Sequence, residues 1–387
     1  MQYRKDKISG NELSALGLGC MRFPRDKAET ERMVLAAIDG GVNFYDTAYL
    51  YPGSEKTLGT ILAKHGRRGD VYIATKLPCA LCKSADDFGK YLDEQLRRLQ
   101  TDYIDYYFMH NLTSFAQWEG LRKIGIEQWL ADKKRAGTLR QVGFSYHGTS
   151  EDFLKILSSY HWEFCMIQYN YYGENYQAGK KGLKAAAEKG IPVIIMEPLL
   201  GGKLATGLPE RAVKMFAKAE PALTPADWGL WWLWNQNEVT VVLSGMSAMG
   251  QLEDNLRSAD SFRPLTGNEL AVYADVVELL KKSYKIPCTN CNYCLPCPVG
   301  INIPACIEAY NASYVQGLKT GATLYYTSIA ALSKENGSPH RCNQCGKCEK
   351  ACPQFIPIRK ELKKAARRFE PLPVRLVVSL VRRILTR

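Results

Sequence analysis

Short apolar runs alternate with amphipathic stretches from residue 15 to about residue 260. The apolar runs are rich in Val, Ile and Tyr and predict buried strands at 15–21, 43–48, 71–76, 104–110, 142–146, 164–169, 193–199 and 239–245. The stretches between them have helical periodicity and predict helices that include 31–39, 54–64, 86–99, 127–136, 150–159 and 182–189. Strands that alternate with helices in this way are typical of parallel βαβ units.

Eight such units in roughly 250 residues fit a (β/α)8 TIM barrel. A doubly wound sheet is the competing α/β architecture, but no G-x-G-x-x-G follows the first predicted strand. After the barrel, helical periodicity continues at 269–281, 303–316 and 322–334. The chain therefore has room for a barrel and a small, mainly helical domain.

Eight of the thirteen cysteines fall into two runs within this second region. The runs are Cys288, Cys291, Cys294 and Cys297, and Cys342, Cys345, Cys348 and Cys352, each followed by a proline. The second run has the C-x2-C-x2-C-x3-C-P spacing of bacterial ferredoxins, and the first is one residue shorter before its fourth cysteine. In two-cluster ferredoxins the fourth cysteine binds the other cluster. We therefore expect two [4Fe-4S] clusters, one on Cys288, Cys291, Cys294 and Cys352 and one on Cys342, Cys345, Cys348 and Cys297.

Zinc is the alternative metal, because C-x2-C pairs also make tetrahedral sites. A zinc site has no use for the repeated Cys-Pro ending, so the pattern favours clusters. A disulfide framework is typical of short secreted chains, whereas this chain is long and its body is poor in cysteine. Cys306 is expected to be a small buried residue. Cys79 and Cys82 are expected to be two loop thiols, with a redox pair or part of a metal site as the alternatives.

These patterns give three predicted segments. They are a barrel at 1–265, a ferredoxin-like iron–sulfur domain at 266–370 and a basic amphipathic tail at 371–387. Of the net charge of +12, residues 359–387 carry +8, with ten Lys or Arg against two Glu. Because the charge is concentrated there, it does not indicate nucleic-acid binding.

The tail predicts an amphipathic helix that contacts an anionic membrane surface or a partner, or packs on its own barrel or a sister subunit. The first residues lack the apolar core of a signal peptide, and no apolar run has the length of a transmembrane helix. We therefore expect a cytoplasmic protein.

Five polar residues lie at or near the ends of predicted strands: Asp46, Lys76, His110, Ser145 and Gln168. In a TIM barrel the carboxyl ends of the strands carry the catalytic groups. A strand-end Asp often caps the next helix, and a lone strand-end His is more often scaffolding. Five such residues at one face of a barrel favour an active site.

Residues 43–55, Asn-Phe-Tyr-Asp-Thr-Ala-Tyr-Leu-Tyr-Pro-Gly-Ser-Glu, resemble the D-T-A-x-x-Y-G-x-S-E element of aldo/keto reductases. The resemblance continues through 74–76, 102–111, 198–201 and 252–256, and so spans about 10–260. The doubled cysteine motif is similar to the branch of that family with a C-terminal ferredoxin-like domain. The family implies an oxidoreductase that reduces an aldehyde or ketone with NAD(P)H.

By this resemblance, the catalytic tetrad is Asp46, Tyr51, Lys76 and His110. Carbonyl reduction develops negative charge on oxygen and needs a proton donor in a positive environment. Lys76 beside Tyr51 is expected to lower the pKa of the phenol. Asp46 is expected to hold the ammonium, and His110 to orient the carbonyl.

The resemblance also implies the cofactor-binding residues Ser145, Gln168, Pro198, Leu199, Gly201, Ser244, Gly245, Met246, Gln251 and Asn255. Three positions differ from the best-known members. Tyr146 stands where an Asn completes the carboxamide clamp, and Met196 where an aromatic ring stacks on the nicotinamide. Gln251 replaces an Arg that grips the 2′-phosphate, which leaves the choice between NADP and NAD open.

Nicotinamide delivers an electron pair as hydride, whereas a [4Fe-4S] cluster passes single electrons, and no flavin-binding motif is apparent. Two further hypotheses therefore stand beside an NAD(P)H-dependent reductase. One is a reductase that a ferredoxin-type partner feeds through the clusters. The other is a non-catalytic electron-transfer subunit.

Overall fold

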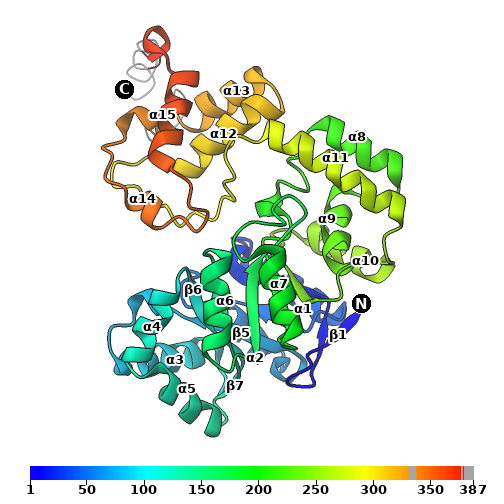
Figure 1. The fold of residues 1–387 in the computed structure, drawn as a ribbon, viewed down its shortest axis with the longest axis vertical. Helices are drawn as coiled ribbons and strands as arrows, with labels where there is room; N and C mark the ends of the chain where they lie inside the picture. Colours follow the sequence, from blue (N-terminus) through cyan, green and yellow to red (C-terminus); the bar gives the residue numbers. More distant parts are fainter. Residues whose placement is uncertain (331–336, 376–377, 379–387) are drawn as a thin grey trace. The chain divides into compact units, whose positions relative to one another are not determined.

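The computed structural model describes residues 1–330, 337–375 and 378 (Figure 1). The chain divides into two compact units. The first comprises Met1–Leu199 and Ala226–Thr266, and the second comprises Leu200–Pro225 and Gly267–Arg387. No described helix is both long enough and apolar enough to cross a membrane.

The first unit is a closed barrel of eight parallel strands in the order β10-β3-β4-β5-β6-β7-β8-β9. The strands are β3 (Leu16–Gly19), β4 (Phe44–Asp46), β5 (Tyr72–Leu77), β6 (Ile104–Leu112), β7 (Leu139–Tyr146), β8 (Phe164–Gln168), β9 (Val193–Met196) and β10 (Val239–Ser244). Every predicted apolar run forms one of them. The TIM barrel is confirmed.

Helices follow the barrel strands, as βαβ units require. They are α1 (Lys27–Asp39), α2 (Ser54–Lys64), α3 (Ala85–Leu99), α4 (Phe115–Lys123), α5 (Ile126–Arg135), α6 (Ser150–Ser159), α7 (Gly179–Glu188), α9 (Pro225–Trp234) and α10 (Met249–Ser261). Side chains cap several of them: Asp26 accepts from Ala28 N at 2.8 Å, and Ser84 forms a capping box with Asp87 on α3. The caps explain why α1 and α3 begin where they do.

An N-terminal hairpin of β1 (Tyr3–Lys5) and β2 (Glu12–Ser14) covers one end of the barrel. Leu13 joins the interior core beside Tyr106 and Phe164. The Tyr106 hydroxyl donates to Asp6 at 2.9 Å and accepts from Asn11 at 3.1 Å. Tyr106 lies near the start of β6, so the hairpin seals the amino ends of the strands. The carboxyl ends are left for a site.

The second unit is helical. Its helices are α8 (Glu210–Ala219), α11 (Gly267–Ser283), α12 (Ile303–Val315), α13 (Leu318–Ser328), α14 (Lys347–Lys350) and α15 (Ile358–Phe369). Its core packs Ile303, Ile307, Tyr325 and Leu362 against several cysteines of both runs. The predicted small, mainly helical domain is thus present, while the boundaries of the predicted domains stay a prediction. Residues 200–225, which the prediction counted with the barrel, belong to this unit.

Two sequence predictions reach beyond the described residues. The predicted helix 322–334 overlaps α13, which ends at Ser328, and residues 331–334 lie outside the described part. Most of the predicted tail helix, 376–377 and 379–387, also lies outside it.

Helix α2 packs closely on α3 at Gly59. A Cβ at Gly59 would lie 2.5 Å from the carbonyl oxygen of Arg98, which is rigid backbone. We expect Gly59→Ala to destabilise the barrel by roughly 1–3 kcal/mol, because the helices must move apart. Thermal unfolding followed by circular dichroism measures this.

Gly89→Ala is the matched control, because Gly89 lies inside α3 and a Cβ there meets nothing within 4 Å. It should stabilise the protein by up to about 1 kcal/mol through helix propensity. Equal midpoints for the two variants would contradict this account of helix packing.

Candidate active site and cluster domain

A buried lysine lies at the carboxyl end of β5. Lys76 is 1% exposed, and its Nζ lies 2.6 Å from Asp46 Oδ1 at the end of the neighbouring strand β4. Nζ also donates to Thr47 O at 2.6 Å. Burial raises the pKa of Asp46, and the adjacent Lys76 ammonium opposes that shift. The two charges therefore depend on each other inside the barrel.

Tyr51 reaches this pair from the loop between β4 and α2. The Lys76 Nζ lies 4.7 Å from the centroid of the Tyr51 ring. Two turns fix the loop, since Tyr51 N donates to Ala48 O at 3.0 Å and Ser54 N donates to Tyr51 O at 3.1 Å. The Tyr51 and His110 rings meet edge to face at 6.0 Å. The structure thus brings Asp46, Tyr51, Lys76 and His110 together.

His110 is held in its neutral form. Burial lowers its pKa well below the ordinary value, and Lys76 and His147 lower it further. Burial also lowers the pKa of His147 to about 4, although a hydrogen bond with Gln177 opposes the shift. At neutral pH His110 therefore keeps one ring N–H that can donate a hydrogen bond.

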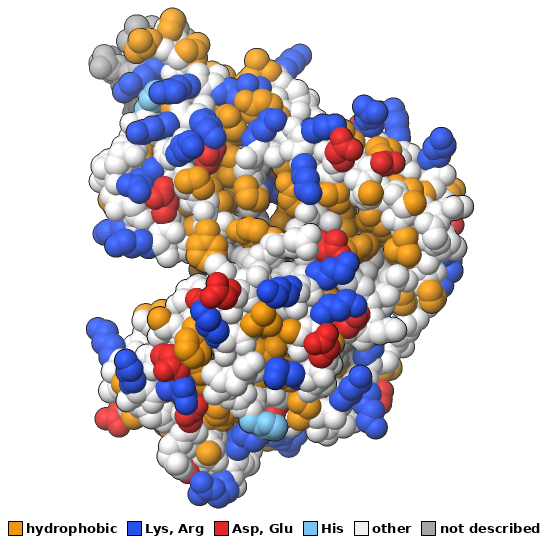
Figure 2. Space-filling model, viewed as in Figure 1, with side chains coloured by type: hydrophobic (Ala, Val, Ile, Leu, Met, Phe, Trp, Pro, Cys, Tyr) orange, Lys and Arg blue, Asp and Glu red, His pale blue; other side chains and the backbone are white. Residues whose placement is uncertain are grey.

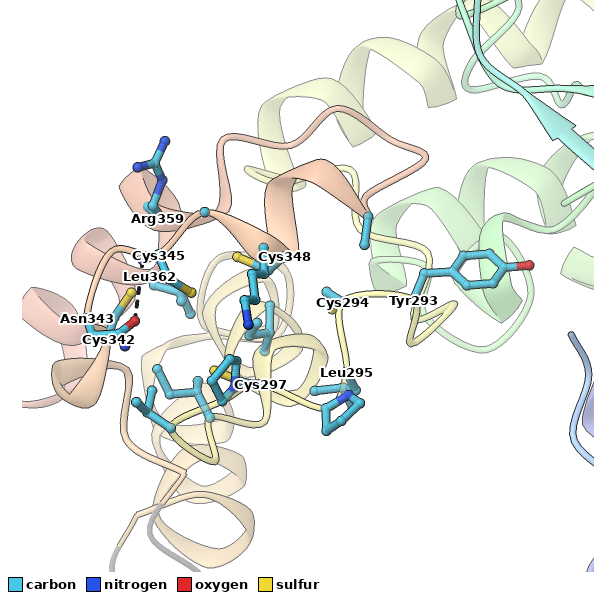
Figure 3. A pocket seen from close by; sticks show the side chains of 18 residues that line it. Tyr293, Cys294, Leu295, Cys297, Cys342, Asn343, Cys345, Cys348, Arg359 and Leu362 are labelled. Carbon is cyan, nitrogen blue, oxygen red and sulfur yellow. Dashed lines mark hydrogen bonds between the residues drawn. The ribbon is translucent and has the colours of Figure 1, made fainter. Parts of the chain in front are cut away.

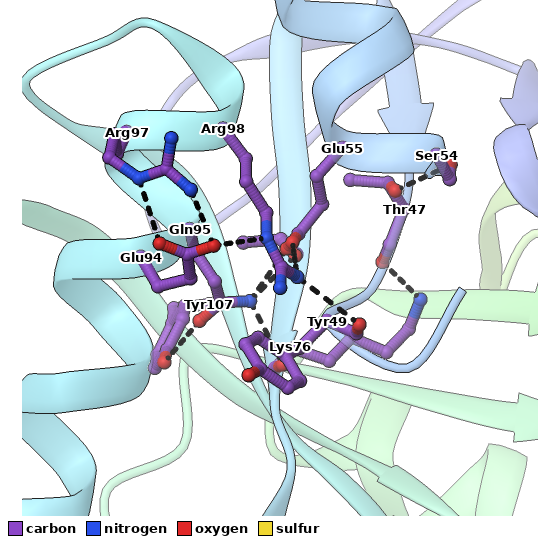
Figure 4. Close-up of polar contacts among 11 residues, drawn as sticks. Thr47, Tyr49, Ser54, Glu55, Lys76, Glu94, Gln95, Arg97, Arg98 and Tyr107 are labelled. Atoms are coloured by element: carbon purple, nitrogen blue, oxygen red, sulfur yellow. Dashed lines mark hydrogen bonds and ion pairs between the residues drawn. The ribbon is translucent and has the colours of Figure 1, made fainter. Parts of the chain in front are cut away.

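A buried polar network supports Lys76 from the outer side of the barrel (Figure 4). Glu55 accepts from the Thr75 hydroxyl at 2.6 Å and from Gln95 Nε2 at 2.8 Å. Gln95 also donates to Lys76 O at 3.1 Å, and Arg98 pairs with Glu55 at 3.1 Å. Glu55, the last residue of the 43–55 element, therefore has a structural role: it holds α2 and α3 against β5, the strand that carries Lys76.

Two predicted cofactor residues, Ser145 and Gln168, lie buried on the neighbouring strands β7 and β8. The Ser145 hydroxyl accepts from Asn111 N at 2.8 Å. Tyr146 turns its hydroxyl to Thr149 O at 2.7 Å and packs against Phe153 of α6. Tyr146, which stands where an Asn was expected to hold the nicotinamide carboxamide, therefore contributes to the packing of α6.

The loops after β9 and β10 hold most of the other predicted cofactor residues. Pro198 and Leu199 follow β9, and Gly245 and Met246 follow β10. Asn255 donates to Ser244 Oγ at 2.9 Å, and Gln251 accepts from Ser247 N at 2.8 Å. Gln251 thus helps to cap the first turn of α10.

Gly201 belongs to the second unit. Its φ is +68°, and a Cβ there would lie 2.2 Å from Thr289 O, so only glycine fits. Lys203 Nζ donates to Cys288 O, and the Tyr284 hydroxyl donates to Gly207 O at 2.6 Å. The loop at 201–207 is therefore bound to the segment that begins the first cysteine run.

Two buried residues at the catalytic end were not predicted. Cys20 follows β3 directly; burial raises the pKa of its thiol well above the ordinary value, as does Asp46, while Lys76 opposes them. His147 follows β7 and influences His110. Both satisfy the strand-end rule that singled out the other candidates.

Cys79 is buried, with its pKa raised by burial, and Cys82 is half-buried with a pKa of about 12, raised by burial, so neither is a reactive thiolate.

The eight cysteines of the two runs line two cavities in the second unit. One cavity, of about 160 Å³, is lined by Cys294, Cys297, Cys342, Cys345 and Cys348 (Figure 3). The other, of about 20 Å³, is lined by Cys288, Cys291, Cys294 and Cys352. Each cavity thus contains the four cysteines of one expected set, with Cys294 lining both, and the assignment of the cluster ligands stays a prediction.

The backbone of the two runs winds in the same way. Positive φ angles occur two and four residues after the first cysteine of each run, at Asn290, Asn292, Gln344 and Gly346. After the fourth cysteine the repeat resumes, since Gly300 N donates to Cys297 O at 2.9 Å and Phe355 N to Cys352 O at 3.2 Å. The first run is one residue shorter before Cys297, but the backbone turn that follows its fourth cysteine is the same as in the second run.

The thiols of the two runs surround two cavities, an arrangement that suits clusters. An amide also supports one ligand, since Gln344 Nε2 donates to Cys342 Sγ at 3.2 Å. Cys306 is fully buried in the core, as predicted, and lines neither cavity.

Comparison with protein families gives two matches. Residues 15–278 match the model of the aldo/keto reductase family. Residues 287–357 match a 4Fe-4S dicluster domain.

Individual proteins match the barrel region. An aldo-keto reductase of Mycolicibacterium vanbaalenii is 31% identical over 67% of this chain and 87% of its own length. L-galactose dehydrogenase of Arabidopsis thaliana is 29% identical over 71% of this chain and 91% of its own. Among solved structures, aldo-keto reductase AKR11C1 from Bacillus halodurans in its holo form has a TM-score of 0.61 and 26% identity, over 71% of this chain and 96% of that one.

The cavity linings predict how the clusters respond to loss of one thiol. We expect the wild-type protein, purified without oxygen, to hold about eight iron atoms. In Cys352→Ala, the cavity of Cys288, Cys291 and Cys294 loses its fourth thiol, so that cluster should degrade to a three-iron form. Metal analysis and electron paramagnetic resonance of the oxidised protein would detect the loss.

Cys306→Ala is the control, because it removes a buried thiol that lines neither cavity. It should keep the full iron content. Stoichiometric zinc in the wild type, or equal iron loss in both variants, would refute the assigned ligands.

Proposed function

Because the chain belongs to the aldo/keto reductase family and carries a 4Fe-4S dicluster domain, we propose that it reduces an aldehyde or ketone to an alcohol. The observation that carries this proposal is the buried Lys76 ammonium, 2.6 Å from Asp46 and 4.7 Å from the Tyr51 ring. A fixed positive charge beside a phenol favours the charge that develops on a carbonyl oxygen during reduction.

Each member of the tetrad has one role in the proposal. Tyr51 gives its hydroxyl proton to the carbonyl oxygen, and Lys76 stabilises the phenolate that remains. Asp46 holds the Lys76 side chain in place through the ion pair. Neutral His110 donates a hydrogen bond that orients the carbonyl, which its lowered pKa supports.

A nicotinamide cofactor, when bound, supplies the hydride. Ser145 and Gln168 are the residues proposed to hold its carboxamide, since both are buried at the carboxyl ends of adjacent strands. Pro198, Leu199, Ser244, Gly245, Met246 and Asn255 are proposed to border the rest of it. Gln251 is uncharged, and its side-chain carbonyl accepts from Ser247 N at the start of α10. It therefore offers no positive charge to a 2′-phosphate, and NADP and NAD both remain candidates.

Electron delivery through the clusters is the second candidate for the donor. The two four-thiol cavities favour it, because paired clusters are suited to passing single electrons. In that version Tyr51 still supplies the proton. The tetrad is therefore tested separately from the electron source.

Tyr51→Phe tests the proton donor. It keeps the ring beside Lys76 and removes the hydroxyl, so turnover of a carbonyl substrate found by anaerobic screening should fall by about 10²–10⁴-fold. Steady-state kinetics measures the loss, with nucleotide affinity and iron content expected to stay unchanged.

Tyr49→Phe is the matched control in the same loop, where the Tyr49 ring lies under Arg98. It should retain near-normal turnover. A fully active Tyr51→Phe enzyme would remove Tyr51 from the mechanism.

Lys76→Met tests the charge. Without the ammonium, ionisation of the phenol becomes less favourable, so the phenol stays protonated to higher pH and the pH optimum should move upward. Turnover should fall at the same time, because the developing oxyanion loses its neighbouring charge. A pH–rate profile with an unchanged or lower optimum would contradict the assignment.

A further inference from the structure

The surface around the second cysteine run is basic. Between residues 338 and 375 the exposed charged side chains other than His340 are Arg341, Lys347, Lys350, Lys360, Lys363, Lys364, Arg367 and Arg375. The acidic residues of this segment are withdrawn from solvent: Glu349 pairs with Arg359 at 2.7 Å, and Glu361 and Glu370 are buried. Figure 2 shows Lys and Arg side chains gathered over the part of the chain with α14 and α15.

Helix α15 arranges part of this charge as a stripe. Lys360, Lys363, Lys364 and Arg367 follow the spacing of one helix face. The opposite face places Leu362 and Phe369 in the core of the unit. Leu362 and Arg359 of the same helix line the cavity of Cys297, Cys342, Cys345 and Cys348, so the basic stripe borders that cluster site.

The first cysteine run does not share this charge. Residues 286–307, which contain the whole first cysteine run, include no charged residue. In contrast, Cys345 of the second run is itself exposed, with Lys347 two residues away. Its cluster would thus lie close to the surface, surrounded by cations.

We propose that this basic face docks an acidic one-electron carrier protein, which passes electrons to the cluster held by Cys297, Cys342, Cys345 and Cys348. The inference rests on the proposed cluster ligands and not on the catalytic tetrad. In each encounter the reduced carrier loses one electron and the cluster gains it, with no bond made or broken. Complementary charge speeds such encounters and fixes their orientation.

The test uses the full-length, anaerobically purified protein with both clusters and an acidic bacterial two-cluster ferredoxin as the probe. The variant Lys360→Glu/Lys363→Glu/Arg367→Glu reverses charge on α15 without touching a cavity-lining residue. We expect ferredoxin binding at low salt to weaken by at least about tenfold. For the wild type, binding should weaken steeply as salt rises, because screening removes the attraction.

Stopped-flow absorption gives a second measurement. Reduced ferredoxin should bleach the clusters of the wild type at least about tenfold faster than those of the triple variant. Both proteins should contain the same amount of iron, which shows that the variant keeps its clusters.

Lys7→Glu/Lys181→Glu/Lys189→Glu is the matched control, with the same change in charge at exposed positions of the barrel unit. It should bind ferredoxin as the wild type does. Equal weakening in both triple variants, or none in the α15 variant, would overturn the proposal. Binding of anionic phospholipid vesicles in place of ferredoxin would also overturn it, and would indicate a membrane surface instead.

Discussion

The arrangement of side chains at the carboxyl end of the barrel depends on one ion pair held away from water. Lys76 is almost fully buried, and the ion pair with Asp46 and the hydrogen bond to Thr47 O replace its hydration. A buried pair of this kind adds little net stability, but removing one partner commonly costs about 3–5 kcal/mol, because the other charge is left uncompensated. The surrounding structure follows from this constraint. Glu55, Gln95 and Arg98 hold the strand and the two helices behind the lysine, and the positive charge helps to keep His110 neutral.

A different constraint applies to the 4Fe-4S dicluster domain: its backbone must place cysteine thiols around two cavities. Its two cysteine runs repeat the same left-handed turns, and each lends its fourth cysteine to the cavity of the other. The first run also fixes the loop at 201–207, through Lys203 and through the close approach of Gly201 to Thr289. The first cysteine run and the loop at 201–207 are therefore parts of one packed segment of the second unit.

Much of this could be predicted from the sequence, because the relevant signals are local. Apolar runs and helical periodicity located all eight barrel strands, and cysteine spacing located the two runs whose thiols line the two cavities. The side-chain direction of Tyr146 could not be predicted, since packing against Phe153 of α6 decides it. Cys20 and His147 were missed although both follow strands directly, because the family resemblance assigns the four catalytic positions to other residues. The attachment of residues 200–225 to the helical unit depends on contacts far apart in sequence, such as Phe216 with Tyr273.

The central claim is that the barrel is a working carbonyl reductase with Tyr51 as its proton donor and a nicotinamide as its hydride donor. A single-turnover experiment without oxygen tests this most directly, with NADPH or NADH that carries deuterium at the transferable position and an aldehyde substrate. The account predicts that deuterium appears on the carbinol carbon of the alcohol, with either nucleotide or with both. Alcohol formed without deuterium, from electrons supplied only through the clusters, would contradict it.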